Sequence, residues 1–169
     1  VLSYDKLVLT PGAEPFVPDI QGINNPKIHT LRMLKDGNAI KEIVKNTNAK
    51  NAVVIGGGFI GVEMAENFKH LKGVNTTLVE LSSHILPPVD KETAAFAQNE
   101  MRKHGVNLVL SDGVKAFDND YVVLNSGRKL PYDIAVLAIG VKPQTSLARE
   151  CGLVIGKSGG VKVNEHMPS

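Results

Sequence analysis

Residues 52–80 read Ala-Val-Val-Ile-Gly-Gly-Gly-Phe-Ile-Gly-Val-Glu-Met, then an apolar helical stretch, then Thr-Thr-Leu-Val-Glu. This segment contains, in order, a β-branched run, three glycines spaced as G-x-G-x-x-G, a helix, a second strand and a terminal acid. This order predicts a dinucleotide-binding βαβ unit. The glycines are Gly56, Gly58 and Gly61, and the acid is Glu80, 19 positions after Gly61. A lone glycine pattern is weak evidence, and a tight turn without a ligand is the alternative.

Each of these residues has a physical task in such a unit. Gly56 permits the tight turn, Gly58 has no Cβ to keep the backbone from a pyrophosphate, and Gly61 lets the helix press against the strand. We expect the pyrophosphate at the unpaired N–H groups and positive dipole of the helix N-terminus. The Glu80 carboxylate is expected to accept hydrogen bonds from the adenosine ribose hydroxyls.

The residues after Glu80 predict the choice of cofactor. An NADP site usually offers a cation to the 2′-phosphate here, but Leu81, Ser82, Ser83, His84 and Ile85 follow. His84 is mostly neutral near pH 7, because the unperturbed pKa of histidine is about 6.5. Repulsion between a carboxylate and a 2′-phosphate amounts to roughly 1 to 4 kcal/mol. NAD(H) is therefore predicted over NADP(H).

The composition predicts an ordinary globular domain. The 169 residues are 43% hydrophobic and 21% charged, with a net charge of +2 and no basic stripe, which gives no indication of a nucleic-acid partner. No apolar run approaches the roughly 18 residues of a membrane span, and residues 1–4 do not resemble a signal peptide. We therefore expect no membrane partner and a cytoplasmic location.

The cysteine and the histidines of the chain give no indication of a disulfide, a metal site or a catalytic residue. The single Cys151 excludes an internal disulfide or a two-cysteine redox pair within this chain, and we expect it to be a small buried thiol at the end of a short helix. The five histidines lie far apart without ligand spacing, so we expect surface histidines and no metal site. No residue of the chain is predicted to be a nucleophile or a general base.

The elements around the glycine unit predict the fold class. We expect strands at 4–10, 53–55, 76–80, 106–110 and 134–139, helices at 36–46, 58–72 and 91–104, and short antiparallel strands at 114–117, 121–124 and 128–130. Within 58–72, an apolar stripe predicts a core-facing side, formed by Ile60, Met64, Phe68 and Leu71. The chain is thus predicted to be an α/β, three-layer Rossmann-like FAD/NAD(P)-binding domain with a central parallel sheet and an antiparallel β excursion.

Two segments, Tyr4–Pro15 and Tyr132–Pro143, resemble each other and a known family pattern. The chain resembles the middle of a flavoprotein of the pyridine nucleotide-disulfide oxidoreductase superfamily. It is most similar to the branch of coenzyme A disulfide reductases, NADH-dependent persulfide reductases and NADH oxidases. Thr10-Pro11-Gly12 replaces the more frequent Ala-Thr-Gly and is similar to the Ser-Pro-Gly of the coenzyme A and persulfide branch.

The resemblance implies an excised domain. Residues 1–16 would end a segment of the FAD domain, 17–146 would form the NAD(H)-binding domain, and 147–169 would begin the return to the FAD domain. FAD would be bound mainly outside this chain, and the remaining FAD and dimerisation domains would be missing partners. The fragment alone is expected to be inactive.

The resemblance also assigns site residues. The nicotinamide dinucleotide would lie against Gly56, Gly57, Gly58, Phe59, Ile60 and Gly61, with Glu80 at the ribose and Ala138, Ile139 and Gly140 beside the cofactor. Glu63 would orient the nicotinamide carboxamide toward the flavin. The alternative for Glu63 is a solvated helix acid or a partner of Lys69 or Lys72.

In the parent protein, the resemblance implies that NADH passes a hydride to flavin and onward to a disulfide, coenzyme A disulfide, persulfide or oxygen. A non-catalytic NADH-binding or sensory module is one alternative, and NADH oxidase rather than disulfide reductase activity is another. A dehydrogenase of a different class is disfavoured because Tyr121 and Tyr132 lack a Tyr-x-x-x-Lys companion.

Overall fold

The computed structural model describes residues 2–71 and 73–167, and these fall into two compact units. The larger unit runs from Pro15 to Gly140, and the smaller one joins the residues up to Glu14 with those from Val141 onward. The predicted assignment of the two end segments to an FAD domain stays a prediction.

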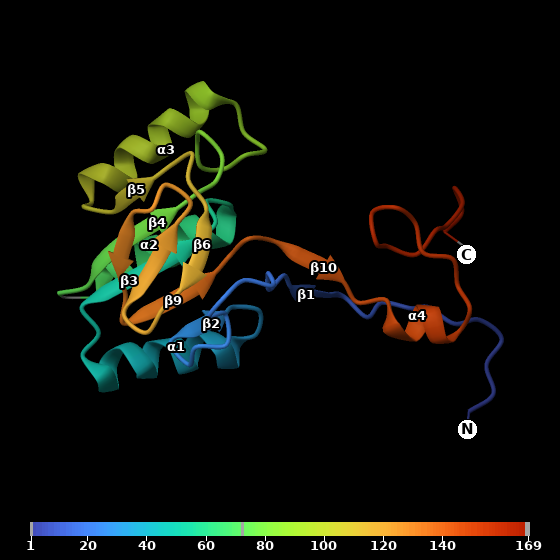
Figure 1. Cartoon of the computed structure of the whole chain (residues 1–169). Helices are drawn as coiled ribbons and strands as arrows, with labels where there is room; N and C mark the ends of the chain where they lie inside the picture. The colour runs from blue at the N-terminus through green and yellow to red at the C-terminus, as the bar shows by residue number, and fades with distance from the viewer. Residues whose placement is uncertain (1, 72, 168–169) are drawn as a thin grey trace. The chain divides into compact units, whose positions relative to one another are not determined.

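The larger unit is built on a five-stranded parallel sheet (Figure 1). Its strand order is β2-β9-β3-β4-β5, with bounds β2 Ile28–Thr30, β3 Asn51–Ile55, β4 Asn75–Val79, β5 Asn107–Val109 and β9 Ile134–Leu137. From β3 the chain proceeds to β4 and β5, and then crosses back to place β9 on the other side of β3. The order therefore reverses between β3 and β9, and ligands of open α/β sheets bind at the carboxyl ends of the strands at such a reversal.

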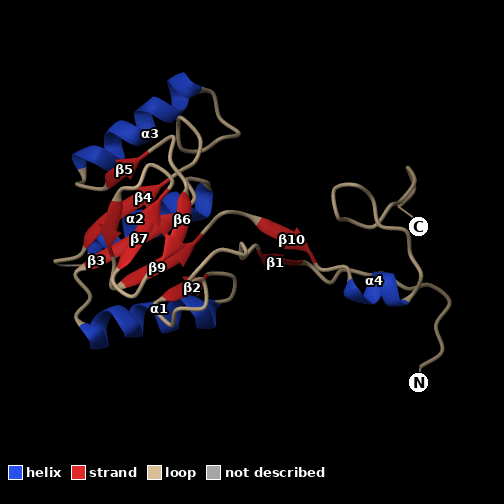
Figure 2. Cartoon of the chain, viewed as in Figure 1, coloured by secondary structure: helices blue, strands red, loops and turns tan. Residues whose placement is uncertain are grey.

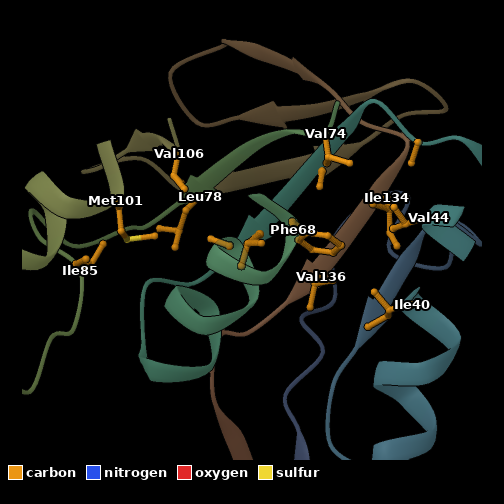
Figure 3. Packing of buried hydrophobic residues seen from close by; sticks show 14 residues of the cluster. Ile40, Val44, Phe68, Val74, Leu78, Ile85, Met101, Val106, Ile134 and Val136 are labelled. Atoms are coloured by element: carbon orange, nitrogen blue, oxygen red, sulfur yellow. The ribbon is translucent and has the colours of Figure 1, made fainter. Parts of the chain in front are cut away.

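Three helices cover one face of this sheet, namely α1 (Leu34–Thr47), α2 (Phe59–His70) and α3 (Lys91–Lys103). Their apolar residues pack on alternate sheet residues, as Figure 3 shows for Val44 of α1, Phe68 of α2 and Met101 of α3. Asp90 caps α3, since its Oδ1 accepts a hydrogen bond of 2.8 Å from the N–H of Thr93. These helices thus hold the strands whose carboxyl ends carry the candidate site.

The opposite face is covered by strands rather than helices (Figure 2). β6 (Val114–Phe117), β7 (Tyr121–Leu124) and β8 (Lys129–Pro131) form an antiparallel sheet in the order β6-β7-β8. Tyr132 closes this layer, because its ring packs edge-on against Phe117 and its hydroxyl donates to the carbonyl oxygen of Asp118 at 2.9 Å. The predicted fold class is confirmed, with the antiparallel sheet standing where a doubly wound fold has helices.

Short elements at the edges differ from the sequence prediction. The expected strand at 4–10 is wrong: these residues form no strand, and Leu7 and Val8 are exposed because no strand among the described residues pairs with them. Instead β1 (Ala13–Pro15) pairs with β10 (Val141–Pro143), and α4 (Ser146–Glu150) follows. Strand β2 was not predicted, since it has only three residues and two of them are polar.

Two predictions about single side chains are also wrong. Cys151 is exposed rather than buried, because it lies beyond the last turn of the short helix α4. His29 is not a surface histidine, since it lies on β2 with its Nε2 buried and without a hydrogen-bond partner. Burial lowers the pKa of His29 below the ordinary value.

Over the described residues, no helix is long and apolar enough to cross a membrane.

Candidate dinucleotide-binding site

The turn after β3 is packed so tightly that it requires glycine at two positions. Gly56 has a φ of +105°, and a Cβ there would lie 2.3 Å from the carbonyl oxygen of Ala138. A Cβ at Gly61 would lie 1.8 Å from the carbonyl oxygen of Gly56. Both contacts are with backbone atoms that cannot move aside. The first and third glycines of the pattern thus bring α2 against β3 and β9.

Gly58 has a different environment, because a Cβ added there would meet nothing within 4 Å. Its backbone is extended, with φ −72° and ψ −175°, which other residues can adopt. Sterics within the chain therefore do not require a glycine at this position. The space beside Gly58 lies at the start of α2, where the sequence predicts a pyrophosphate.

The N-terminus of α2 is free of side-chain caps. Gly58 is the N-cap and makes no side-chain hydrogen bond, whereas Asp90 caps α3. The first N–H groups of a helix have no partner within the helix, and the helix dipole adds positive potential at this end. Phe59 and Ile60, in this first turn, are both exposed, at 61% and 46% of their surface. An anion can therefore approach the N–H groups of the first turn directly.

The exposure of Ile60 corrects the predicted core stripe of α2. The buried residues of this helix are Gly61, Ala65 and Phe68. Met64 and Leu71 are only partly buried against the same core. Because α2 lies almost against the sheet at Gly61, its inward face is centred on small residues rather than on Ile60.

Glu80 follows β4 and is only 9% exposed. Its Oε2 accepts a hydrogen bond of 2.6 Å from the N–H of Gly57, and its Oε1 accepts one of 2.7 Å from the N–H of Ser82. A carboxylate has about four lone-pair positions, so acceptor capacity for two ribose hydroxyls remains. Glu80 therefore does more than was predicted, because it ties the glycine turn to the end of β4.

Gly57 is held on both sides. Besides its bond to Glu80, its carbonyl oxygen accepts a hydrogen bond of 2.6 Å from the N–H of Leu86. A Cβ at Gly57 would lie 3.1 Å from three atoms of Glu80. The N–H of Gly57 thus points to a side chain of this chain, so we assign Gly57 to shaping the turn, and its contact with a cofactor stays a prediction.

The end of β9 lies beside the glycine turn. The N–H of Ala138 donates to the carbonyl oxygen of Ile55 at 2.7 Å, and Ala138 is the nearest side chain to the Cβ position of Gly61. Ile139 is 36% exposed, and Gly140 has a φ of +107° with open space at its Cβ position. The structure therefore brings Ala138 and Ile139 next to the turn between β3 and α2, at the reversal of strand order, and Gly140 follows them directly in the chain.

Glu63 lies on the exposed side of α2, one turn beyond the N-terminus. Among the described residues it forms no ion pair, and its backbone carbonyl accepts a hydrogen bond from Asn67. The end of the alternative partner Lys69 instead lies near Gly105, with its Nζ 3.2 Å from the position that a Cβ at Gly105 would take. The other alternative, Lys72, lies outside the described residues. Glu63 is thus free to approach a ligand at this edge.

Two residues after Glu80 bear on cofactor choice. Leu81, which follows Glu80 directly in the chain, is apolar and 71% exposed. His84 is partly buried, and its Nδ1 lies 2.8 Å from the carbonyl oxygen of Ile85, so the ring donates to its own loop. The histidine that could have met a 2′-phosphate is therefore engaged elsewhere.

Sequence reasoning missed the residues that hold these groups in place. The loop after β5 binds the backbone next to Glu80, and Leu86 binds Gly57. None of these contacts has a sequence pattern, because they join backbone atoms of loops that meet only in the folded chain.

The whole chain matches one family model. Residues 1–169 match the model described as pyridine nucleotide-disulphide oxidoreductase. The NADH oxidase of Methanocaldococcus jannaschii is 34% identical over 98% of this chain. The NAD(P)H coenzyme A polysulfide/persulfide reductase of Pyrococcus horikoshii is 35% identical over 98% of it. The chain spans 38% of the length of each of these relatives.

Solved structures agree with this match. Reduced CoADR-RHD of Bacillus anthracis is 45% identical with a TM-score of 0.91, over 96% of this chain and 30% of that one. An engineered water-forming NADPH oxidase bound to NADPH, made from the Lactobacillus brevis enzyme, is 29% identical with a TM-score of 0.89. That match covers 99% of this chain and 37% of the oxidase.

Proposed function

The chain belongs to the pyridine nucleotide-disulphide oxidoreductase family, and we propose that it is the NAD(H)-binding domain of an FAD-dependent member. In that proposal bound NADH would supply a hydride to the flavin of the full-length protein, and the electrons would go on to a disulfide, a coenzyme A disulfide, a persulfide or oxygen. The observation that carries the proposal is the uncapped start of α2, with open space at Gly58 and the Glu80 carboxylate beside it.

The residues present fit a dinucleotide. The first-turn N–H groups of α2 would hold the pyrophosphate, because they are donors at the positive end of a helix. The remaining lone pairs of Glu80 would accept the ribose hydroxyls. Phe59, Ile60 and Ile139 would give the nicotinamide end an apolar surface, since all three are exposed at this edge.

We propose NADH rather than NADPH as the preferred cofactor. A 2′-phosphate beside Glu80 would meet a carboxylate that is already fixed by two N–H groups, and Leu81 offers it no positive charge. The engineered oxidase bound to NADPH supports this reasoning. Its name records an aspartate replaced by alanine and the next residue replaced by arginine. Removal of an acid and addition of a cation are the changes that the electrostatic argument requires.

Calorimetry on the isolated chain tests the proposal. We expect NADH to bind with a stoichiometry of one and FAD not to bind, because the glycine unit is complete and most of a flavin-binding domain is not in this chain. NADH affinity is expected to be modest, since no flavin forms a wall of the nicotinamide site. Stoichiometric FAD binding, or no NADH binding at millimolar concentration, would contradict it.

A further inference from the structure

The segment that carries Glu80 is braced by the loop after β5. The last ladder bond of β4 joins the N–H of Glu80 to the carbonyl oxygen of Val109. Beyond that point, the N–H of Asp112 donates to the carbonyl oxygen of Glu80 at 3.2 Å, and the N–H of Ser111 donates to that of Ser82 at 2.9 Å. The backbone on both sides of Leu81 is therefore held by residues 111–112.

Side-chain packing adds to this brace. A Cβ at Gly113 would lie 3.1 Å from Cδ1 of Leu81, so the leucine side chain lies directly beside the glycine. Ser111 has a φ of +57°, which is an unfavourable backbone for a residue with a side chain. A contact from outside the loop would help to stabilise this conformation.

Asp112 provides that contact by joining the loop to the turn between β7 and β8. Its Oδ2 accepts a hydrogen bond of 2.5 Å from the hydroxyl of Ser126, and its Oδ1 accepts bonds from the N–H groups of Ser126 at 3.2 Å and Gly113 at 3.0 Å. The N–H of Asn125 also donates to the carbonyl oxygen of Gly113 at 2.8 Å. The hydrogen bond from the hydroxyl of Ser126 favours the charged carboxylate and lowers the pKa of Asp112 below its ordinary value.

We propose that Asp112 is a positioning residue for cofactor choice, acting through the brace on Glu80 and Ser82. The inference rests on the proposed function, since it concerns the carboxylate that would bind the ribose. Hydrogen bonds weaken steeply with distance and angle, so a displaced Glu80 would bind the 2′-hydroxyl less well. The antiparallel sheet would then serve cofactor choice, although none of its strands reaches the site.

The test compares Asp112→Ala with Asp118→Ala in the full chain. Asp118 is the matched control, because it holds the other turn of the same sheet through bonds to the N–H groups of Asp120 and Tyr121. Ser126→Ala is a gentler second variant, which removes only the hydroxyl bond to Asp112. Each variant is titrated with NADH and with NADPH, and its free energy of unfolding is measured in urea.

We expect Asp112→Ala to reduce the ratio of the NADPH dissociation constant to the NADH dissociation constant at least threefold. Most of this change should come from weaker binding of NADH. Ser126→Ala should reduce the ratio less, and Asp118→Ala should leave it unchanged. A ratio within twofold of wild type in Asp112→Ala would overturn the inference. So would an equal reduction in Asp118→Ala, since that would indicate a general effect of destabilising the sheet.

Amide hydrogen exchange separates this inference from the proposed function, because it needs no ligand. The N–H groups of Gly57 and Ser82 donate to Glu80, so we expect them to exchange at least fivefold faster in Asp112→Ala and at the wild-type rate in Asp118→Ala. If wild type does not bind NADH, the proposed function fails. Unchanged exchange in Asp112→Ala shows that Asp112 does not position Glu80, whatever the binding result.

Discussion

Gly58→Ala is expected to separate cofactor binding from folding. A Cβ at Gly58 meets nothing within 4 Å, and its backbone is not left-handed, so the folded chain accommodates alanine. Alanine is a poorer N-cap than glycine by about 0.5–1 kcal/mol, but it lowers the entropy of the unfolded chain by a similar amount, about 0.4–1 kcal/mol. The free energy of unfolding should therefore change by less than about 0.5 kcal/mol.

Gly58→Ala should have a much larger effect on the binding of NADH than on stability. The added methyl group would occupy the space beside the first-turn N–H groups and keep a pyrophosphate from them. A hydrogen bond to a charged group contributes about 1.5–3 kcal/mol, so the loss of one such bond weakens binding at least tenfold. Urea unfolding and calorimetric NADH titration of the same preparation measure the two effects.

Two further variants make this test specific. Gly160→Ala is the matched control, since a Cβ there also meets open space and its backbone is not left-handed. It should change neither stability nor binding. Gly61→Ala should do the reverse of Gly58→Ala and impair folding, because its Cβ would lie 1.8 Å from a backbone oxygen. If Gly58→Ala binds NADH within twofold of wild type, the pyrophosphate does not lie at the start of α2.

Three other predictions address cofactor choice, hydride transfer and pH. Glu80→Ala should reduce the preference for NADH over NADPH, and adding Leu81→Arg to it should reverse that preference. The dissociation constants of both cofactors measure these effects. A tenfold preference for NADPH in the protein with Glu80 intact would refute the role given to Glu80. In the full-length protein, Glu63→Gln should slow flavin reduction in stopped-flow measurements while changing NADH affinity little, since orientation acts on the transition state. An unchanged rate would show that Glu63 is a solvated acid. Because burial lowers the pKa of His29, its stabilising contribution should be complete above about pH 6.5 and decrease as the pH falls toward the lowered native value. His29→Gln should remove this part of the pH dependence in urea unfolding between pH 7.5 and 5.5, whereas His166→Gln, at an exposed position, should not.

The sequence by itself determined the local elements of the larger unit. The predicted helices at 36–46 and 91–104 and the antiparallel strands at 114–117 and 121–124 agree with α1, α3, β6 and β7. The reason is that apolar period, caps and turn residues act over a few positions along the chain. The glycine spacing likewise placed Gly56 and Gly61 correctly, because the positive φ of Gly56 and the contact of Gly61 with the carbonyl oxygen of Gly56 both arise within the turn itself.

Tertiary structure decided what depends on neighbours far apart in sequence. Residues 4–10 have a strand-like pattern but no strand beside them among the described residues, whereas the unremarkable Ile28–Thr30 pairs with β9. Ile60 matched the apolar period of α2, yet it is exposed because the sheet meets that helix at Gly61. Glu80 could be identified from its position after β4, but its bond to Gly57 and the brace from Asp112 could not. Those contacts join loops 23 and 32 residues away from Glu80 with no spacing rule, so only the packed sheet brings their atoms within hydrogen-bond distance.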